Sequence, residues 1–180
     1  MADITINIAG GVLARLRQHL LPDGGLCEEA AFLYARAVTA GDGLEFQVLE
    51  VNAIPPEGFA SRSRYYLELR DDTRVQVIKR AHDLGASLIE CHSHPGQRGA
   101  CFSWSDLHGF DEFVPHVMWR LKGRPYAAIV MAPDSFDALV WRGGGASPEV
   151  LVRVDTESAS FTPTCLTHQN WSEIYDRQPL

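Results

Sequence analysis

The sequence lacks the features that mark membrane, secreted and repetitive proteins. No apolar run in its 180 residues approaches the ~20 residues needed to span a bilayer. The first residues, MADITINIAGG, do not have the basic and then strongly apolar layout of a secretory signal. Internal repeats and low-complexity tracts are absent as well. We therefore expect a cytoplasmic globular protein with no membrane partner.

Positive charge is also scarce. The 16 Lys and Arg residues are outnumbered by 23 Asp and Glu residues, which gives a formal net charge of −7 and a pI near 5.4. A protein whose main partner is nucleic acid needs a basic surface for the phosphates. This charge balance therefore argues against nucleic acid as the partner.

Several cysteine and zinc motifs are missing too. The four cysteines (Cys27, Cys91, Cys101 and Cys165) are widely spaced and form no CxxC pair, so we expect free thiols of mostly packing function. There is no H-E-x-x-H helix motif, and no H-x-E with P-C-x-x-C as in nucleobase deaminases. These absences exclude the commonest zinc-hydrolase signatures.

The chain has the composition and length of one globular domain. Hydrophobic residues make up 46% and charged residues 22%, and 180 residues are too few for two comfortable domains. We assign the domain to residues 1–157. Residues 158–180 form a C-terminal tail, whose polar and irregular sequence is typical of a mobile segment.

Hydrophobic periodicity alternates between strand-like and helical along the chain, which predicts an α/β fold. Helices are predicted where apolar residues recur at helical spacing and Gly or Pro follows: 11–21, 73–84 and 104–121. Strands are predicted at 30–38, 44–51, 65–70, 86–93, 126–131, 138–141 and 150–154. The first two of these strands flank the turn 40–43, which has hairpin chemistry.

Residues with metal-ligand chemistry gather between positions 90 and 106, in ECHSHPGQRGACFSWSD. His92 and His94 stand two apart at the end of a predicted buried strand, so both imidazoles point to one side. Asp106 falls in the first turn of the next predicted helix, where its carboxylate can supply a third ligand. Two nitrogens and one oxygen suit zinc, and a fourth position left open for water is typical of a catalytic site.

A catalytic zinc site also needs a group that takes a proton from water and passes it to the leaving group. The Glu28-Glu29 pair leads directly into an apolar predicted strand. Rigid structure can therefore hold one of these carboxylates close to the metal.

Each of these motifs has a simpler explanation. Ser103-Trp104-Ser105-Asp106 fits a capping box, in which Asp106 only satisfies the start of a helix. A lone His-x-His is often surface histidine, and paired glutamates often lie in a solvated turn. The metal site is favoured because all three patterns occur together.

Neighbouring residues are open to more than one interpretation. Glu90 shares the histidine face, where it can orient a ligand imidazole or simply form a salt bridge. Cys91 points to the opposite face, as a core residue would, and Cys101 is either a thiol near the metal or a packing residue. We interpret His108 and His116 as ordinary helix residues.

The combined pattern resembles the JAB/JAMM zinc metalloproteases, the catalytic branch of the MPN (Mov34/PAD-1-like) domain. That family has an upstream glutamate, then His-x-His-Pro, a loop and Ser-x-x-Asp, matched here by His92 to Pro95 and Ser103 to Asp106. With Glu28 in the catalytic place, alanines replace both glycines of the family's strand, whereas Glu29 would put bulky Phe32 at the first glycine position. The resemblance spans residues 11–141. The loop between His94 and Asp106 holds eleven residues, one more than the family pattern.

The resemblance implies a single MPN-like domain with a curved mixed sheet flanked by helices. It implies one Zn²⁺ per chain held by His92, His94 and Asp106, with Glu28 as general base and Ser103 stabilising the oxyanion.

The expected activity is cleavage of a ubiquitin-like protein from its conjugate, or processing of its C-terminal tail. The compact chain is similar to stand-alone prokaryotic members, which often work beside activating and conjugating enzymes. Two alternatives stay open: a metal-free MPN scaffold, and a zinc amidohydrolase for a small molecule or a sulfur-carrier protein.

Overall fold

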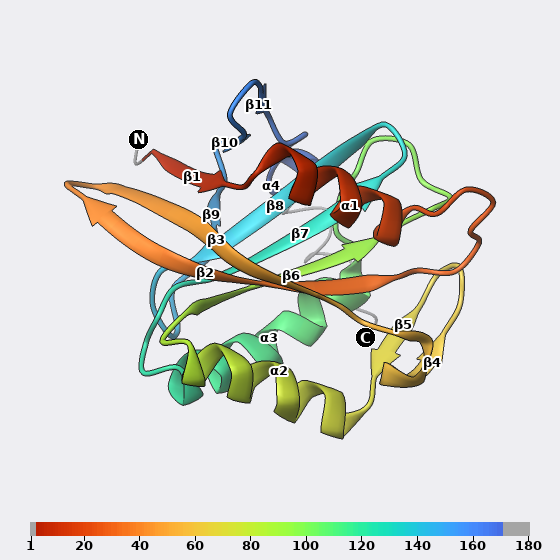
Figure 1. The fold of residues 1–180 in the computed structure, drawn as a ribbon, viewed down its shortest axis with the longest axis horizontal. Coiled ribbons are helices and arrows are strands. Elements are labelled where there is room, and N and C mark those ends of the chain that lie inside the picture. The colour runs from red at the N-terminus through yellow and green to blue at the C-terminus, as the bar shows by residue number, and fades with distance from the viewer. Residues whose placement is uncertain (1–2, 171–180) are drawn as a thin grey trace.

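A curved, nine-stranded mixed sheet forms the centre of the protein, in a computed structural model that describes residues 3–170 (Figure 1). Its strands run in the order β11-β10-β1-β3-β2-β6-β7-β8-β9. Helix α1 packs on one face, and helices α2 and α3 cover the other (Figure 1). Strands β4 and β5 form a separate two-stranded sheet.

The strands have the following bounds: β1 Ile4–Asn7, β2 Ala30–Ala40, β3 Gly43–Ala53, β4 Phe59–Arg62, β5 Leu67–Leu69, β6 Ser87–Ser93, β7 Tyr126–Ala132, β8 Ser135–Trp141, β9 Glu149–Val150, β10 Arg153–Asp155 and β11 Ser160–Phe161. The helices are α1 Gly10–Leu20, α2 Asp71–Asp83, α3 Trp104–Arg120 and α4 Leu166–Gln169, with a 3-10 turn at Pro56–Gly58. Within the described part of the chain, no helix is both long and apolar enough to cross a membrane.

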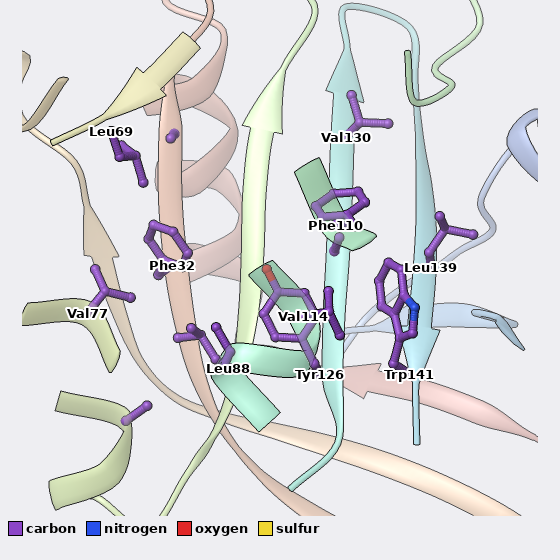
Figure 2. Packing of buried hydrophobic residues seen from close by; sticks show 14 of the residues in the cluster. Phe32, Leu69, Val77, Leu88, Phe110, Val114, Tyr126, Val130, Leu139 and Trp141 are labelled. Atoms are coloured by element: carbon purple, nitrogen blue, oxygen red, sulfur yellow. The ribbon is translucent and has the colours of Figure 1, made fainter. Parts of the chain in front are cut away.

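Alternation of side chains along the strands divides the core into two layers. On the face covered by α2 and α3, large apolar side chains such as Phe32, Tyr126 and Trp141 pack against Val77 and Phe110 (Figure 2). The residues between them in sequence point the other way and pack under α1. The central strands are therefore buried on both sides, which explains their nearly continuous apolar sequences.

The structure confirms an α/β domain with a curved mixed sheet and flanking helices. The three long predicted helices are present, with ends shifted by one or two residues, and α3 continues through Pro115. The predicted strand at 65–70 is reduced to the three residues of β5. Strands β1, β4 and β11 were not predicted, because runs of two to four residues carry little periodicity.

The single strand predicted at 150–154 is wrong. The segment is split between β9, which pairs with β8, and β10, which pairs with β1 and β11. These partners lie at opposite ends of the sheet, a consequence of its curvature that local periodicity cannot reveal. The predicted tail, residues 158–180, contains β11 and α4, and its last part, residues 171–180, lies outside the described residues.

Candidate metal centre

The antiparallel pairing of β2 with β6 brings Glu28 to the two histidines. Ala30 lies opposite His92, and residues directly opposite each other share a face of the sheet. Beyond this ladder the Ser93 N–H donates to the Glu29 carbonyl (3.0 Å), and the Glu29 N–H donates to Ser93 Oγ (3.0 Å). The pairing therefore continues past the end of β2, and Glu28 comes level with His94.

His92, His94 and Asp106 converge as the sequence predicts. His92 Nε2 lies 3.5 Å from Asp106 Oδ1, and His94 Nε2 lies 3.4 Å from Asp106 Oδ2. The ligand atoms of the three residues all lie within 4.8 Å of one another. Four ligands held tetrahedrally at 2.0–2.1 Å from zinc are separated by about 3.3 Å from each other. The observed separations are long for hydrogen bonds and close to this metal-ligand spacing.

An unsatisfied nitrogen supports the fit to a metal ion. His92 is buried, and its Nε2 has no hydrogen-bond partner. Buried polar atoms rarely lack a partner, because leaving one unpaired costs free energy. A cation between His92 and Asp106 would satisfy this atom. Among the described residues, this is also the one group of three or more His, Cys, Asp or Glu side chains that could hold one ion.

The opposite ring nitrogen of His94 is held by Gln97. His94 Nδ1 lies 2.7 Å from Gln97 Oε1, and because an amide oxygen only accepts, Nδ1 carries the proton. Nε2 is then unprotonated and available as a ligand, the usual arrangement for metal-bound histidine. The Gln97 amide in turn donates to Cys101 Sγ (3.0 Å). Cys101 therefore contacts the residue behind His94 and lies outside the candidate ligand group.

Glu90 lies behind His92. Its Oε1 is 3.9 Å from His92 Nδ1, and its Oε2 accepts a hydrogen bond from the Tyr126 hydroxyl (2.7 Å). Both interpretations of Glu90 thus have a counterpart in the structure: it lies beside a ligand imidazole and it is packed against a polar partner. Cys91, on the other face of β6, is fully buried in the layer under α1, as predicted.

The two neighbouring glutamates occupy different environments. Glu28 is 5% exposed, and its Oε1 lies 3.8 Å from His94 Nε2. Burial raises the pKa of Glu28 to about 7, although nearby His94 and His92 oppose the shift. Glu29 instead forms an ion pair with Arg62. Glu28 is therefore the carboxylate that faces the histidines, and its pKa suits a group that exchanges protons near neutral pH.

Asp106 belongs to the capping box as well as to the metal group. The Ser103 N–H donates to Asp106 Oδ2 (2.7 Å), and the Asp106 N–H donates to Ser103 Oγ (3.2 Å). The Ser103 hydroxyl also donates to Asp106 Oδ2 (2.8 Å). Asp106 thus forms the capping box, and its carboxylate also faces both histidines, so the two roles are compatible. It fixes the direction of that carboxylate.

The charged side chains of the candidate site shift one another's pKa values. Burial alone would raise the pKa of Asp106, but His92 and His94 hold it well below its usual range. Burial alone would lower the pKa of His92, but Asp106, Glu90 and Glu28 raise it to about 9. Two imidazoles and three carboxylates thus share a small buried space, where each group shifts the pKa of its neighbours.

The site opens into a cleft of about 530 Å³ between α2, α3 and the β4–β5 hairpin. Glu28, His92, Ser103 and Asp106 line one part of the cleft. Its walls carry aromatic and charged side chains, including Tyr65, Tyr66, Arg74, Glu112, Phe113 and His116. The cleft therefore connects two of the predicted ligands, His92 and Asp106, with solvent.

Some site features could not be found from sequence. Gln97 and Tyr126 were missed, because a Gln in a loop and a Tyr in an apolar strand carry no motif. Tyr126 reaches Glu90 from the neighbouring strand β7, 36 positions along the chain. His108 stacks on Trp104 on α3, with ring centroids 5.2 Å apart, and neither it nor His116 joins the metal group. All four cysteines are free thiols, as predicted.

Comparison with known proteins gives no match, either to a protein-family model or to a curated sequence. What the chain does must therefore be inferred from the geometry of its own residues.

Proposed function

We propose that this protein is a zinc-dependent peptidase of the JAB/JAMM type, which releases a ubiquitin-like protein from a conjugate or processes its C-terminal tail. The observation that carries the proposal is the convergence of His92, His94 and Asp106 beside the buried carboxylate of Glu28, at a cleft open to substrate.

The roles of the residues follow from their positions. His92, His94 and Asp106 would hold the ion, and His92 and Asp106 line the cleft. At such a site a bound zinc ion lowers the pKa of a water molecule to about 7 and polarises the scissile carbonyl. Glu28 accepts a proton from the attacking water and delivers it to the leaving amine.

Ser103 is the donor for the oxyanion of the tetrahedral intermediate. Its hydroxyl lines the cleft and donates to Asp106 Oδ2 in the resting arrangement. A rotation about its side chain turns this donor from Asp106 toward substrate. A donor of this kind typically lowers the barrier by about 3–4 kcal/mol.

The proposed substrate is an extended peptide that ends in small residues. Strand β5 borders the cleft through Leu67 and Leu69, and among the described residues it pairs only with β4. An extended substrate can add to its free edge through main-chain hydrogen bonds. Small residues at the cut bond let the substrate backbone approach the metal without a Cβ in the way. Activating and conjugating enzymes of the same pathway are the proposed partners.

A cleft of this size also suits a drug-sized molecule, so a zinc amidohydrolase for a small amide is the second candidate. One experiment separates the two. Zinc-loaded protein is incubated with a ubiquitin-like domain fused through Gly-Gly to a reporter, with the same fusion carrying Leu at the last glycine, and with a panel of small amides. We expect cleavage of the Gly-Gly fusion only, lost with a chelator and restored by zinc. Turnover of small amides without cleavage of either fusion would favour the second candidate.

A further inference from the structure

The loop that joins His94 to Asp106 is held in place by other parts of the chain. On one side it is fastened to the β7–β8 turn, where the Gly99 N–H donates to Asp134 Oδ1 (3.1 Å) and the Ala100 N–H donates to Ser135 Oγ (2.8 Å). These contacts hold the middle of the loop and leave its last residues, just before α3, to another partner.

That partner is the segment around α4. The Phe102 N–H donates to Thr167 Oγ1 (2.9 Å), and Thr164 Oγ1 donates to the Ala100 carbonyl (2.6 Å). The Leu166 side chain also approaches Gly99, where a Cβ would come within 3.2 Å of it. Two threonine side chains, about 65 residues away in the sequence, thus form the hydrogen bonds that a neighbouring strand would otherwise make with this part of the loop.

A buried carboxylate fixes this segment in turn. Asp137 on β8 is 1% exposed, and it accepts hydrogen bonds from the backbone N–H groups of Cys165 (3.1 Å) and Thr167 (2.9 Å). It also accepts from the N–H of Ala138 (2.9 Å). No ion pair involving Asp137 is found within residues 3–170, and its hydrogen-bond donors there are three backbone N–H groups. Burying a carboxylate is costly, and here the cost is offset by hydrogen bonds from three backbone N–H groups, two of which fix the start of α4.

The end of this chain of contacts is the metal group. The Phe102 ring packs on the imidazole of His92, with centroids 5.7 Å apart, and on Phe110 of α3 (5.4 Å). Ser103 follows immediately and caps the helix that carries Asp106. A shift of the Phe102 backbone would therefore move the ring that packs on His92. It would also move the start of α3, the helix that carries Asp106.

We propose that Asp137 and Thr167 are positioning residues of the metal centre, and that the segment 164–169 is a clamp that holds Asp106 in register with His92 and His94. This inference rests on the metal site of the proposed function. It makes the C-terminal segment a part of the site, although none of its residues touches the ion.

The test compares two threonines that differ in location. Thr167→Val keeps the side-chain shape and removes the acceptor for Phe102, whereas Thr167→Ser keeps the hydroxyl. Thr156→Val is the matched control, because Thr156 Oγ1 also bonds backbone groups (Ala159 carbonyl, 3.1 Å), but in the β10–β11 turn. The zinc dissociation constant is measured for each full-length protein by competition with a chromophoric chelator. Exchange of the Phe102 amide hydrogen is measured alongside.

We expect Thr167→Val to weaken zinc binding by about tenfold, the usual scale for residues behind a metal ligand, with faster exchange of the Phe102 amide. Thr167→Ser and Thr156→Val are expected to keep wild-type affinity. A folded Thr167→Val protein with wild-type affinity overturns the clamp, whether or not its Phe102 amide exchanges faster. Asp137→Asn, which weakens the anchor of the segment and leaves Thr167 in place, is expected to weaken zinc binding as well. Wild-type protein that binds no zinc would instead refute the metal site itself.

Discussion

The two faces of strand β6 differ in the kind of side chain that they bury. Ile89 and Cys91 face the layer under α1 and belong to its apolar cluster. Glu90 and His92 face the other side, where carboxylates and imidazoles share a small space and His92 Nε2 has no partner. An apolar residue at position 92 would be cheaper to bury. The difference teaches that burial alone identifies the core, whereas the candidate site is identified by buried imidazoles and a carboxylate that converge on one point.

The largest effect should come from removing a ligand on the polar face. We expect wild-type protein to carry about one zinc per chain and His92→Ala or Asp106→Ala to lose nearly all of it, because two remaining ligands no longer define a site. Elemental analysis of purified protein measures the occupancy. Cys91→Ala is the control from the apolar face, and it should keep its zinc. Full occupancy in both ligand variants would contradict the assignment.

The adjacent glutamates provide the next comparison. Glu28→Gln should keep zinc and lose turnover by about 10²–10⁴-fold, since it removes proton transfer and leaves the ligands intact. Glu29→Gln breaks only the ion pair with Arg62 and should change turnover far less. Single-turnover cleavage and zinc content are measured together. The reverse ranking would mean that Glu29, not Glu28, supplies the base.

Ser103 tests whether a cap can also be a catalytic group. If its hydroxyl serves the oxyanion, Ser103→Ala should slow the chemical step by about 100-fold with unchanged substrate affinity. If it acts only in the capping box, the variant should lose about 1 kcal/mol of stability with turnover per folded molecule unchanged. Thermal melts beside single-turnover rates distinguish these outcomes.

The convergence of the three candidate ligands could be predicted because the position of each is set by a local rule. The period of a strand places His92 and His94 on one face, and Ser103 at a helix start places Asp106 in the first turn. The preference for Glu28 over Glu29 depended on the family pattern, and the structure places Glu28 beside His94.

The supporting residues were not predictable, because they depend on which strands become neighbours. Tyr126 contacts Glu90 only because β7 lies beside β6, and Thr167 contacts Phe102 only because β8 carries Asp137 next to α4. The single strand predicted at 150–154 was wrong for the same reason, because the partners of β9 and β10 cannot be read from local sequence. Sequence periodicity reports which way a side chain points and not what lies across from it.

The smallest expected effect concerns pH, and it sharpens the contrast between the two faces. Glu28 has an ordinary pKa of 4.5 when the chain is unfolded and about 7 in the folded, metal-free protein. As pH rises from 4.5 to 7 the unfolded chain therefore loses its proton first, so stability falls across this window and the loss is complete above pH 7. Glu28→Gln cannot ionise and should escape the penalty. A pKa shift of this size corresponds to about 3 kcal/mol. Melting of the metal-free proteins should show equal temperatures near pH 4 and a variant more stable by about 6–12 °C at pH 8, at about 2–4 °C per kcal/mol. Cys91→Ala, changed on the apolar face, should differ from wild type by the same amount at both pH values. If Glu28→Gln also differs from wild type by the same amount at both pH values, the pKa of Glu28 is not raised by burial.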